Sequence, residues 1–137
     1  MRHIELSIQF PPTPWKRPAG RVVRYDAQLY EKQAFALKVF KALELTGFEL
    51  GPLFMRGVPL SVKMIFHFKK PSLSKLVMPT HLNDVDNLSK FVLDALQSGC
   101  LINKIWVDDG QVVRLVSEKR WCNSEEFIEL EIKELVL

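Results

Sequence analysis

The chain begins with a strict alternation of apolar and polar residues, which is typical of a β-strand with one buried face. Ile4, Leu6, Ile8 and Phe10 fall on that face. This alternation predicts four strands in all, over residues 3–10, 58–68, 112–119 and 127–137. Apolar residues spaced three and four positions apart predict two helices, one over residues 27–45 and one from Asp84 or Val85 to Gln97.

The order of these elements, β-α-β-α-β-β, predicts an α+β fold. We expect the helices to pack on a small mixed or antiparallel sheet, within a single domain over residues 1–137. No internal repeat or linker-like stretch interrupts the pattern.

Composition and charge narrow the class of protein only slightly. Of the 137 residues, 47% are hydrophobic and 26% are charged, as in ordinary globular proteins, so a core can form without disulfides. Cys100 and Cys122 form no CxxC pair and no zinc spacing with the three histidines, which favours idle thiols in a reducing cytoplasm. We expect a cytoplasmic protein without a membrane partner, because the sequence shows neither a signal peptide nor an apolar stretch of about 20 residues. The net charge of +3 favours anionic partners weakly.

Acidic residues at two places in the C-terminal half carry the candidate chemistry. Asp84 and Asp86 lie at the start of the second helix, and Asp108 and Asp109 precede Gly110 at the edge of a strand. Each pair alone is commonly structural, because an Asp often caps a helix and Asp-Asp-Gly often forms a turn. Together the pairs offer the carboxylate oxygens that Mg²⁺ prefers.

Geometry limits which of these acids can share an ion. If the chain is extended at Asp84 and Asp86, both carboxylates point to the same side. Asp108 and Asp109 are adjacent, so on an extended chain they point opposite ways and only one of them can enter the site.

Other chemistries lack their motifs. An EF-hand beginning at Asp84 is excluded, because Leu88 and Ser89 stand where a ligand and a glycine are required. The sequence contains no Gly-x-Ser-x-Gly elbow and no glycine-rich nucleotide loop.

The acidic motifs resemble those of one known family. Asp84-Val85-Asp86-Asn87-Leu88-Ser89-Lys90 is followed by Leu93-Asp94-Ala95-Leu96 and then by Trp106-Val107-Asp108-Asp109-Gly110-Gln111-Val112. This is similar to the D-x-D-N-L-x-K, L-D-A-L and W-x-D-D-x-Q-V pattern of the RusA-type Holliday-junction resolvases (crossover junction endodeoxyribonucleases). Two positions depart from the family: Leu82-Asn83 replaces a frequent Lys-Pro, and Gly110 replaces Ser or Ala. Neither departure removes a ligand, although the first leaves open how phosphate is contacted at the mouth of the site.

The resemblance implies Mg²⁺-dependent cleavage of four-way or branched DNA by a homodimer, with Mn²⁺ as a substitute metal. By position, the family's essential acids correspond to Asp84, Asp86 and Asp109, and its active-site lysine to Lys90. Asp108 and Asn87 would stand behind the ligands and orient them.

Several of these residues also have a simpler interpretation. Lys90 is spaced for a surface ion pair with Asp86, one helical turn away. Asp94 is interpreted as structural, Gln111 as orienting carboxylates or backbone, and Trp106 as part of the core or a dimer interface.

Basic residues in two loops are candidates for DNA phosphate contacts, although a single surface charge is usually only solvated. They are Lys16, Arg17, Arg21, Arg24, Lys69, Lys70 and Lys75. Two alternatives stay open: a nuclease with broader selectivity for flaps or forks, and a non-catalytic DNA-binding protein.

Overall fold

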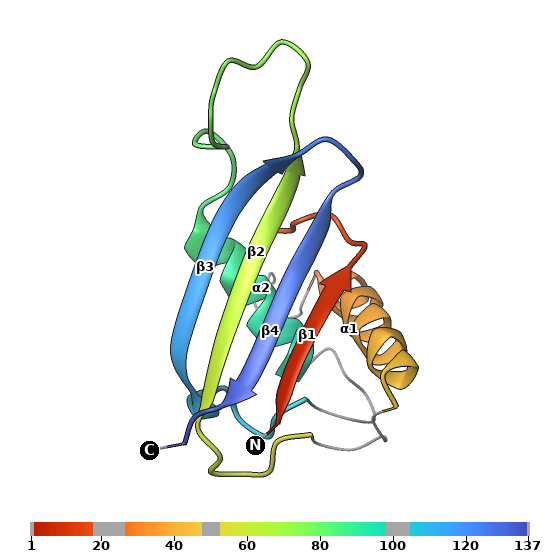
Figure 1. Ribbon diagram of the computed structural model, residues 1–137, viewed down its shortest axis with the longest axis vertical. Helices are drawn as coiled ribbons and strands as arrows, with labels where there is room; N and C mark the ends of the chain where they lie inside the picture. The colour runs from red at the N-terminus through yellow and green to blue at the C-terminus, as the bar shows by residue number, and fades with distance from the viewer. Residues whose placement is uncertain (1, 18–26, 48–52, 98–104, 137) are drawn as a thin grey trace, which may run out of the picture.

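The computed structural model of the chain describes residues 2–17, 27–47, 53–97 and 105–136. The elements within these ranges are β1 (His3–Ile8), α1 (Leu29–Leu45), β2 (Leu60–Lys69), α2 (Val85–Gln97), the short 3₁₀ helix η1 (Asp109–Gln111), β3 (Val112–Cys122) and β4 (Phe127–Glu134) (Figure 1). This is the β-α-β-α-β-β order expected from the sequence, and the α+β class is confirmed.

The four strands form one mixed sheet in the spatial order β1-β4-β2-β3. β4 pairs antiparallel with both β1 and β2, whereas β2 and β3 are parallel. Two neighbouring parallel strands need a crossover connection, because the chain must return to the end at which it started. That crossover contains α2, so the topology lays the helix that carries the acidic motif against the sheet.

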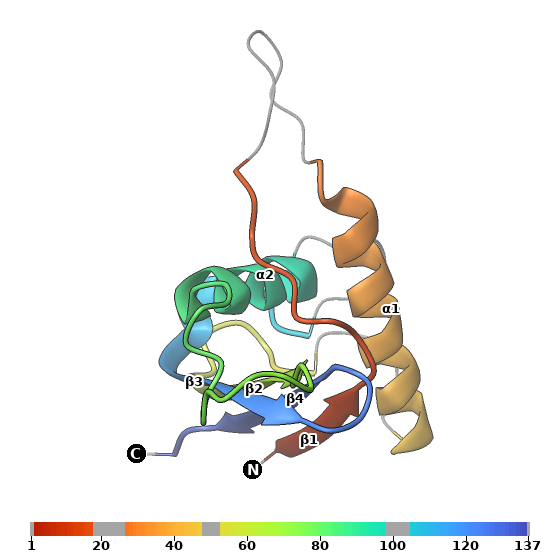
Figure 2. The same ribbon diagram turned by 90° about the horizontal axis from the view of Figure 1, so that it is seen from above.

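Both helices lie on the same side of the sheet (Figure 2). The alternating residues of β1 bury Ile4, Leu6 and Ile8 on this side. Phe35 of α1 and Phe91 of α2 are fully buried between the layers, with ring centroids 6.0 Å apart. We call the side of the sheet that neither helix covers the open face. No helix in the described ranges is long and apolar enough to cross a bilayer.

Candidate functional site

The acidic motif begins at the N-terminal end of α2. The backbone oxygen of Asp84 accepts the hydrogen bond from the Leu88 amide at 3.1 Å, so Asp84 stands at the N-cap position and Asp86 in the first helical turn. Both residues are exposed. The partial positive charge at a helix start stabilises carboxylates there, so two solvent-facing anions fit this position.

On an extended chain, the carboxylates of Asp84 and Asp86 would point to the same side, but α2 already begins at Val85, between the two residues. Asp86 already lies within α2, where residues two positions apart do not face each other. Asp84 precedes the helix, so the helical spacing does not restrict the direction of its carboxylate.

The segment after β1 packs against this end of α2. The Trp15 backbone amide donates to the backbone oxygen of Asn87 at 2.9 Å, and the Lys90 ammonium lies 3.5 Å from the centroid of the Trp15 ring. Lys90 therefore contacts an aromatic face and forms no ion pair with Asp86 within the described part of the chain. Asp84 and Asn87 line one pocket with Pro14, His81, Leu82 and Asn83.

A buried glutamine holds this segment in place. Gln28, which is 1% exposed, accepts from the Lys16 amide at 2.7 Å and donates to the Pro14 oxygen at 2.8 Å. Lys16 and Arg17 follow directly and are exposed. Arg21 and Arg24 lie outside the described residues.

Strand β3 contributes polar groups to the same end of α2. Ser117 and Ser89 share a hydrogen bond of 2.6 Å between their hydroxyls, and Lys119 donates to the Asn83 oxygen at 3.1 Å. Neither Lys119 nor Trp15 was predicted from the sequence to belong to the site. Ser117 and Lys119 occupy alternate positions of one strand, and two polar side chains with that spacing could have indicated a functional face.

Asp109 lies at the opposite end of α2. Its amide donates at 3.0 Å to the side-chain oxygen of Gln97, the last residue of the helix, and its carboxylate accepts from the Trp106 indole at 2.8 Å. A helix of 13 residues is about 20 Å long. A single chain therefore does not bring Asp109 together with Asp84 and Asp86.

The neighbours of Asp109 have well-defined contacts within the chain. Asp108 caps η1, where its carboxylate accepts from the Gly110 amide at 3.0 Å. Gln111 accepts from the amides of Val107 and Asp108 and orients this backbone, in agreement with the interpretation from the sequence. Trp106 is 0% exposed and belongs to the core.

Asp94 of the Leu-Asp-Ala-Leu segment faces α1. Its carboxylate lies 3.7 Å from the ammonium of Lys32, which is itself buried. The pair connects the two helices, which fits the structural interpretation of Asp94.

The lysines of the second loop are exposed. Lys69 ends β2, while Lys70 and Lys75 lie in the connection that leads to α2. All three side chains are thus accessible to solvent in the segment that leads from the end of β2 to Asp84.

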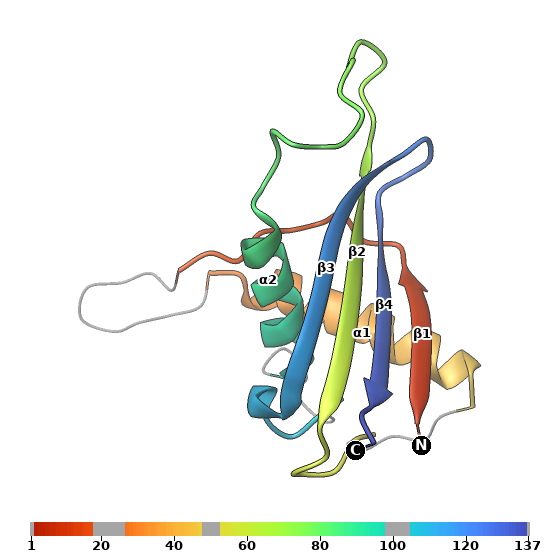
Figure 3. The same cartoon turned by 60° about the vertical axis from the view of Figure 1, so that its left-hand side comes forward.

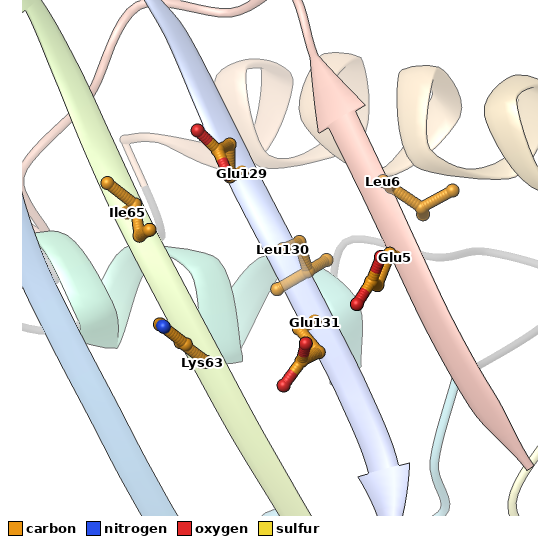
Figure 4. Close-up of a pocket in the computed structure, with 7 residues that line it drawn as sticks. All are labelled: Glu5, Leu6, Lys63, Ile65, Glu129, Leu130 and Glu131. Carbon is orange, nitrogen blue, oxygen red and sulfur yellow. The ribbon is translucent and has the colours of Figure 1, made fainter.

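The one group of three His, Cys, Asp or Glu side chains close enough to hold a metal, within the described ranges, lies elsewhere. His3, Glu5 and Glu131 present ligand atoms within 4.8 Å of one another. They lie on the open face, where Glu131 is in register with Glu5 and with Lys63 (Figure 4). The group shares no residue with the acidic motif.

The environment of Glu131 favours its ionised form. Partial burial opposes ionisation, but side-chain hydrogen bonds shared with Glu5 and His3 and the charges of His3 and Lys133 outweigh it and lower the pKa of Glu131. The His3 ring nitrogen lies 3.4 Å from each of the two carboxylates.

Residues 9–133 match the family described as Endodeoxyribonuclease RusA. The match covers nearly the whole chain and includes both ends of α2 and the η1 segment. No curated protein matches the chain. The chain belongs to the RusA endodeoxyribonuclease family.

Proposed function

We propose that this protein is a metal-dependent endodeoxyribonuclease that resolves four-way DNA junctions by paired symmetric nicks during recombination and repair. Membership of the RusA family supports nuclease chemistry on branched DNA. The observation that carries the proposal is the pair of exposed acids, Asp84 and Asp86, at the start of α2, with Lys90 one turn further along.

The donor atoms of this pair fit a hard divalent cation. Mg²⁺ or Mn²⁺ takes carboxylate oxygens and keeps coordination positions for water and a substrate phosphate, which exposed aspartates leave open. Such an ion supplies an activated water and stabilises charge on the scissile phosphate. Lys90 would hold its ammonium near the same phosphate and stabilise the charge that develops there.

The third acid of the proposed site comes from a second copy of the chain. Asp109 lies at the far end of α2, beyond the reach of Asp84 and Asp86 in its own subunit. In a homodimer with twofold symmetry, Asp109 of the partner subunit would complete each site. The same symmetry supplies two identical sites for two symmetric nicks.

Basic residues around the acids suit the DNA backbone. Lys16 and Arg17 are exposed beside Trp15, and Lys119 lies next to Asn83. Contacts of this kind position DNA without reading its sequence, and they predict affinity that falls steeply with salt.

The test is incubation with a synthetic four-way junction in the presence of Mg²⁺, with the nick positions mapped on each strand. We expect symmetric nicks from the wild type, none without a divalent metal, and none from D86N, which should still bind the junction. Full activity of D86N would contradict the assignment. Parallel reactions with duplex, flap and splayed substrates distinguish a resolvase from a broader nuclease.

A further inference from the structure

Residues 70–84 connect β2 to α2 without a helix or strand and project past the end of the sheet (Figures 1 and 3). Loops longer than roughly 12–15 residues are uncommon in compact domains and are usually functional. This loop has a defined shape, because backbone hydrogen bonds close turns at residues 71–74 and 78–80. Trp121 of β3 fixes it to the sheet by donating its indole N–H to the Leu76 oxygen at 3.0 Å.

The loop turns four large apolar side chains to solvent. Leu73 is 92% exposed, Val77 86%, Met78 46% and Leu76 40%. A cluster of exposed apolar residues on the surface of a soluble protein usually marks a binding site. Other exposed apolar residues, such as Leu45 and Val136, stand apart from this loop.

The charges around this apolar tip indicate the chemistry of its partner. Residues 69–83 contain three lysines and no acid, and Lys69, Lys70 and Lys75 are all exposed. Contact between two copies of the loop would place these lysines near each other, which disfavours a second copy as the occupant. A nucleic acid fits better, because phosphates complement the lysines while base faces accept apolar side chains.

The position of the loop specifies the kind of nucleic acid. Its chain runs into Asp84, and Met78 of the loop lines one pocket with Val85, the first residue of α2, so DNA held at the acidic site would also be close to the loop. Proteins that kink DNA insert apolar side chains between base pairs, at the cost of unstacking them. That cost is lowest where stacking is already interrupted, as at the centre of a junction.

We propose that residues 73–78 act as an apolar wedge that enters the branch point of the DNA, with Lys70 and Lys75 on the flanking phosphates. This inference rests on the proposed function, since it takes branched DNA as the substrate. The wedge gives the protein a preference for branched over duplex DNA that the acidic site alone does not provide.

The test combines L73S/V77S with D86N, so that binding is measured without cleavage. The probe is a four-way junction with 2-aminopurine beside the branch point, whose fluorescence rises when that base unstacks. L45S/V136S is the matched control, because it removes a Leu that is 90% exposed and a Val that is 75% exposed elsewhere on the surface.

We expect D86N and its L45S/V136S derivative to raise the fluorescence equally. The L73S/V77S derivative should lose most of the rise and about tenfold in affinity for the junction, with little change for duplex DNA. An unchanged rise and an unchanged preference for the junction would overturn the wedge. So would a change in oligomeric state, or a loss of binding to anionic phospholipid vesicles with DNA binding intact.

Failure of the wedge and failure of the proposed function give different results. If the wild type does not nick the junction while D86N still unstacks the probe base, the nuclease assignment fails and the wedge stands. If wild-type nicking is normal and L73S/V77S still unstacks the base, the wedge fails and the nuclease assignment stands.

Discussion

The ammonium of Lys90 lies 3.5 Å from the centroid of the Trp15 ring. The Trp15 amide donates a hydrogen bond of 2.9 Å to the backbone oxygen of Asn87, one turn earlier in α2. A cation–π contact at an exposed site contributes about 0.5–1 kcal/mol and restricts where the ammonium can go. Trp15 thus orients the lysine that we propose to act on the scissile phosphate.

Replacing Trp15 with Ala should lower the cleavage rate because Lys90 loses this support. A cation–π contact of about 0.5–1 kcal/mol corresponds to a two- to fivefold change in a rate constant, so we expect a loss of that size in the single-turnover rate constant. Trp15→Phe should recover part of the rate, since a phenyl ring also attracts a cation. Single-turnover cleavage of a junction at saturating protein measures both effects.

The control for this prediction is a double-mutant cycle with Lys90→Met. If Trp15 acts through Lys90, W15A should cause no further loss in the K90M background. A rate loss of the same size in both backgrounds would mean that Trp15 supports some other part of the protein.

Mixing two inactive variants tests whether the site is shared between subunits. D86N and D109N should each be inactive alone, but co-refolding them produces heterodimers in which one site combines an intact Asp86 with the partner's intact Asp109. Random assembly makes half of the dimers heterodimers with one intact site each, so about a quarter of the wild-type nicking activity should return. The measurement is nicking of a junction labelled on each strand. No recovery would mean that each acid acts within its own chain, whereas an active D109N on its own would mean that Asp109 takes no part.

Much of the fold follows from periodicity in the sequence. The acidic helix was expected to begin at Asp84 or Val85 and to end at Gln97, and α2 has these limits because its apolar stripe and its N-cap position agree. Other boundaries shift by a few residues. β3 continues to Cys122, past the expected end at residue 119, because it stays paired with β2 along its length.

The separation of the acids could not be predicted from the same pattern. Hydrophobic periodicity does not reveal that β2 and β3 are parallel neighbours, and it is this pairing that lays α2 along the sheet with Asp109 at its far end. Trp15 was missed for a similar reason, because its contact with Lys90 joins residues 75 positions apart in the sequence. A hydrophobic pattern that repeats every two to four residues gives no information about contacts between residues so far apart in the sequence.

Gln111 is expected to be important for stability through its contacts with the backbone. Its side chain is 7% exposed, accepts from the Val107 and Asp108 amides and donates to the Met55 oxygen at 2.7 Å. Gln111→Ala leaves these groups without partners, so we expect a loss of about 2–4 kcal/mol in the free energy of unfolding. Urea unfolding measures it, with the exposed Asn123→Ala as control. A loss no larger than that of the control would contradict the role.

The charge cluster on the open face predicts how stability depends on pH. The pKa of Glu131 is lowered from its ordinary value of 4.5 in the folded state. The carboxylate therefore stabilises the fold above the unfolded pKa, and this contribution is lost as the pH falls through the lowered folded value. Urea unfolding between neutral and acidic pH should show the wild type losing stability relative to E131Q in this window.

His3 provides the control for this prediction, because its ring nitrogen lies 3.4 Å from a carboxylate oxygen of Glu131. His3→Ala removes a hydrogen bond and a positive charge that favour the ionised form, so the pKa of Glu131 should rise toward its ordinary value. An NMR titration of the Glu131 carboxyl carbon measures the shift directly. His81→Ala, on the far side of the sheet, should leave that pKa unchanged. Equal titration curves for H3A and the wild type would show that Glu5 and Lys133 alone determine the ionisation of Glu131.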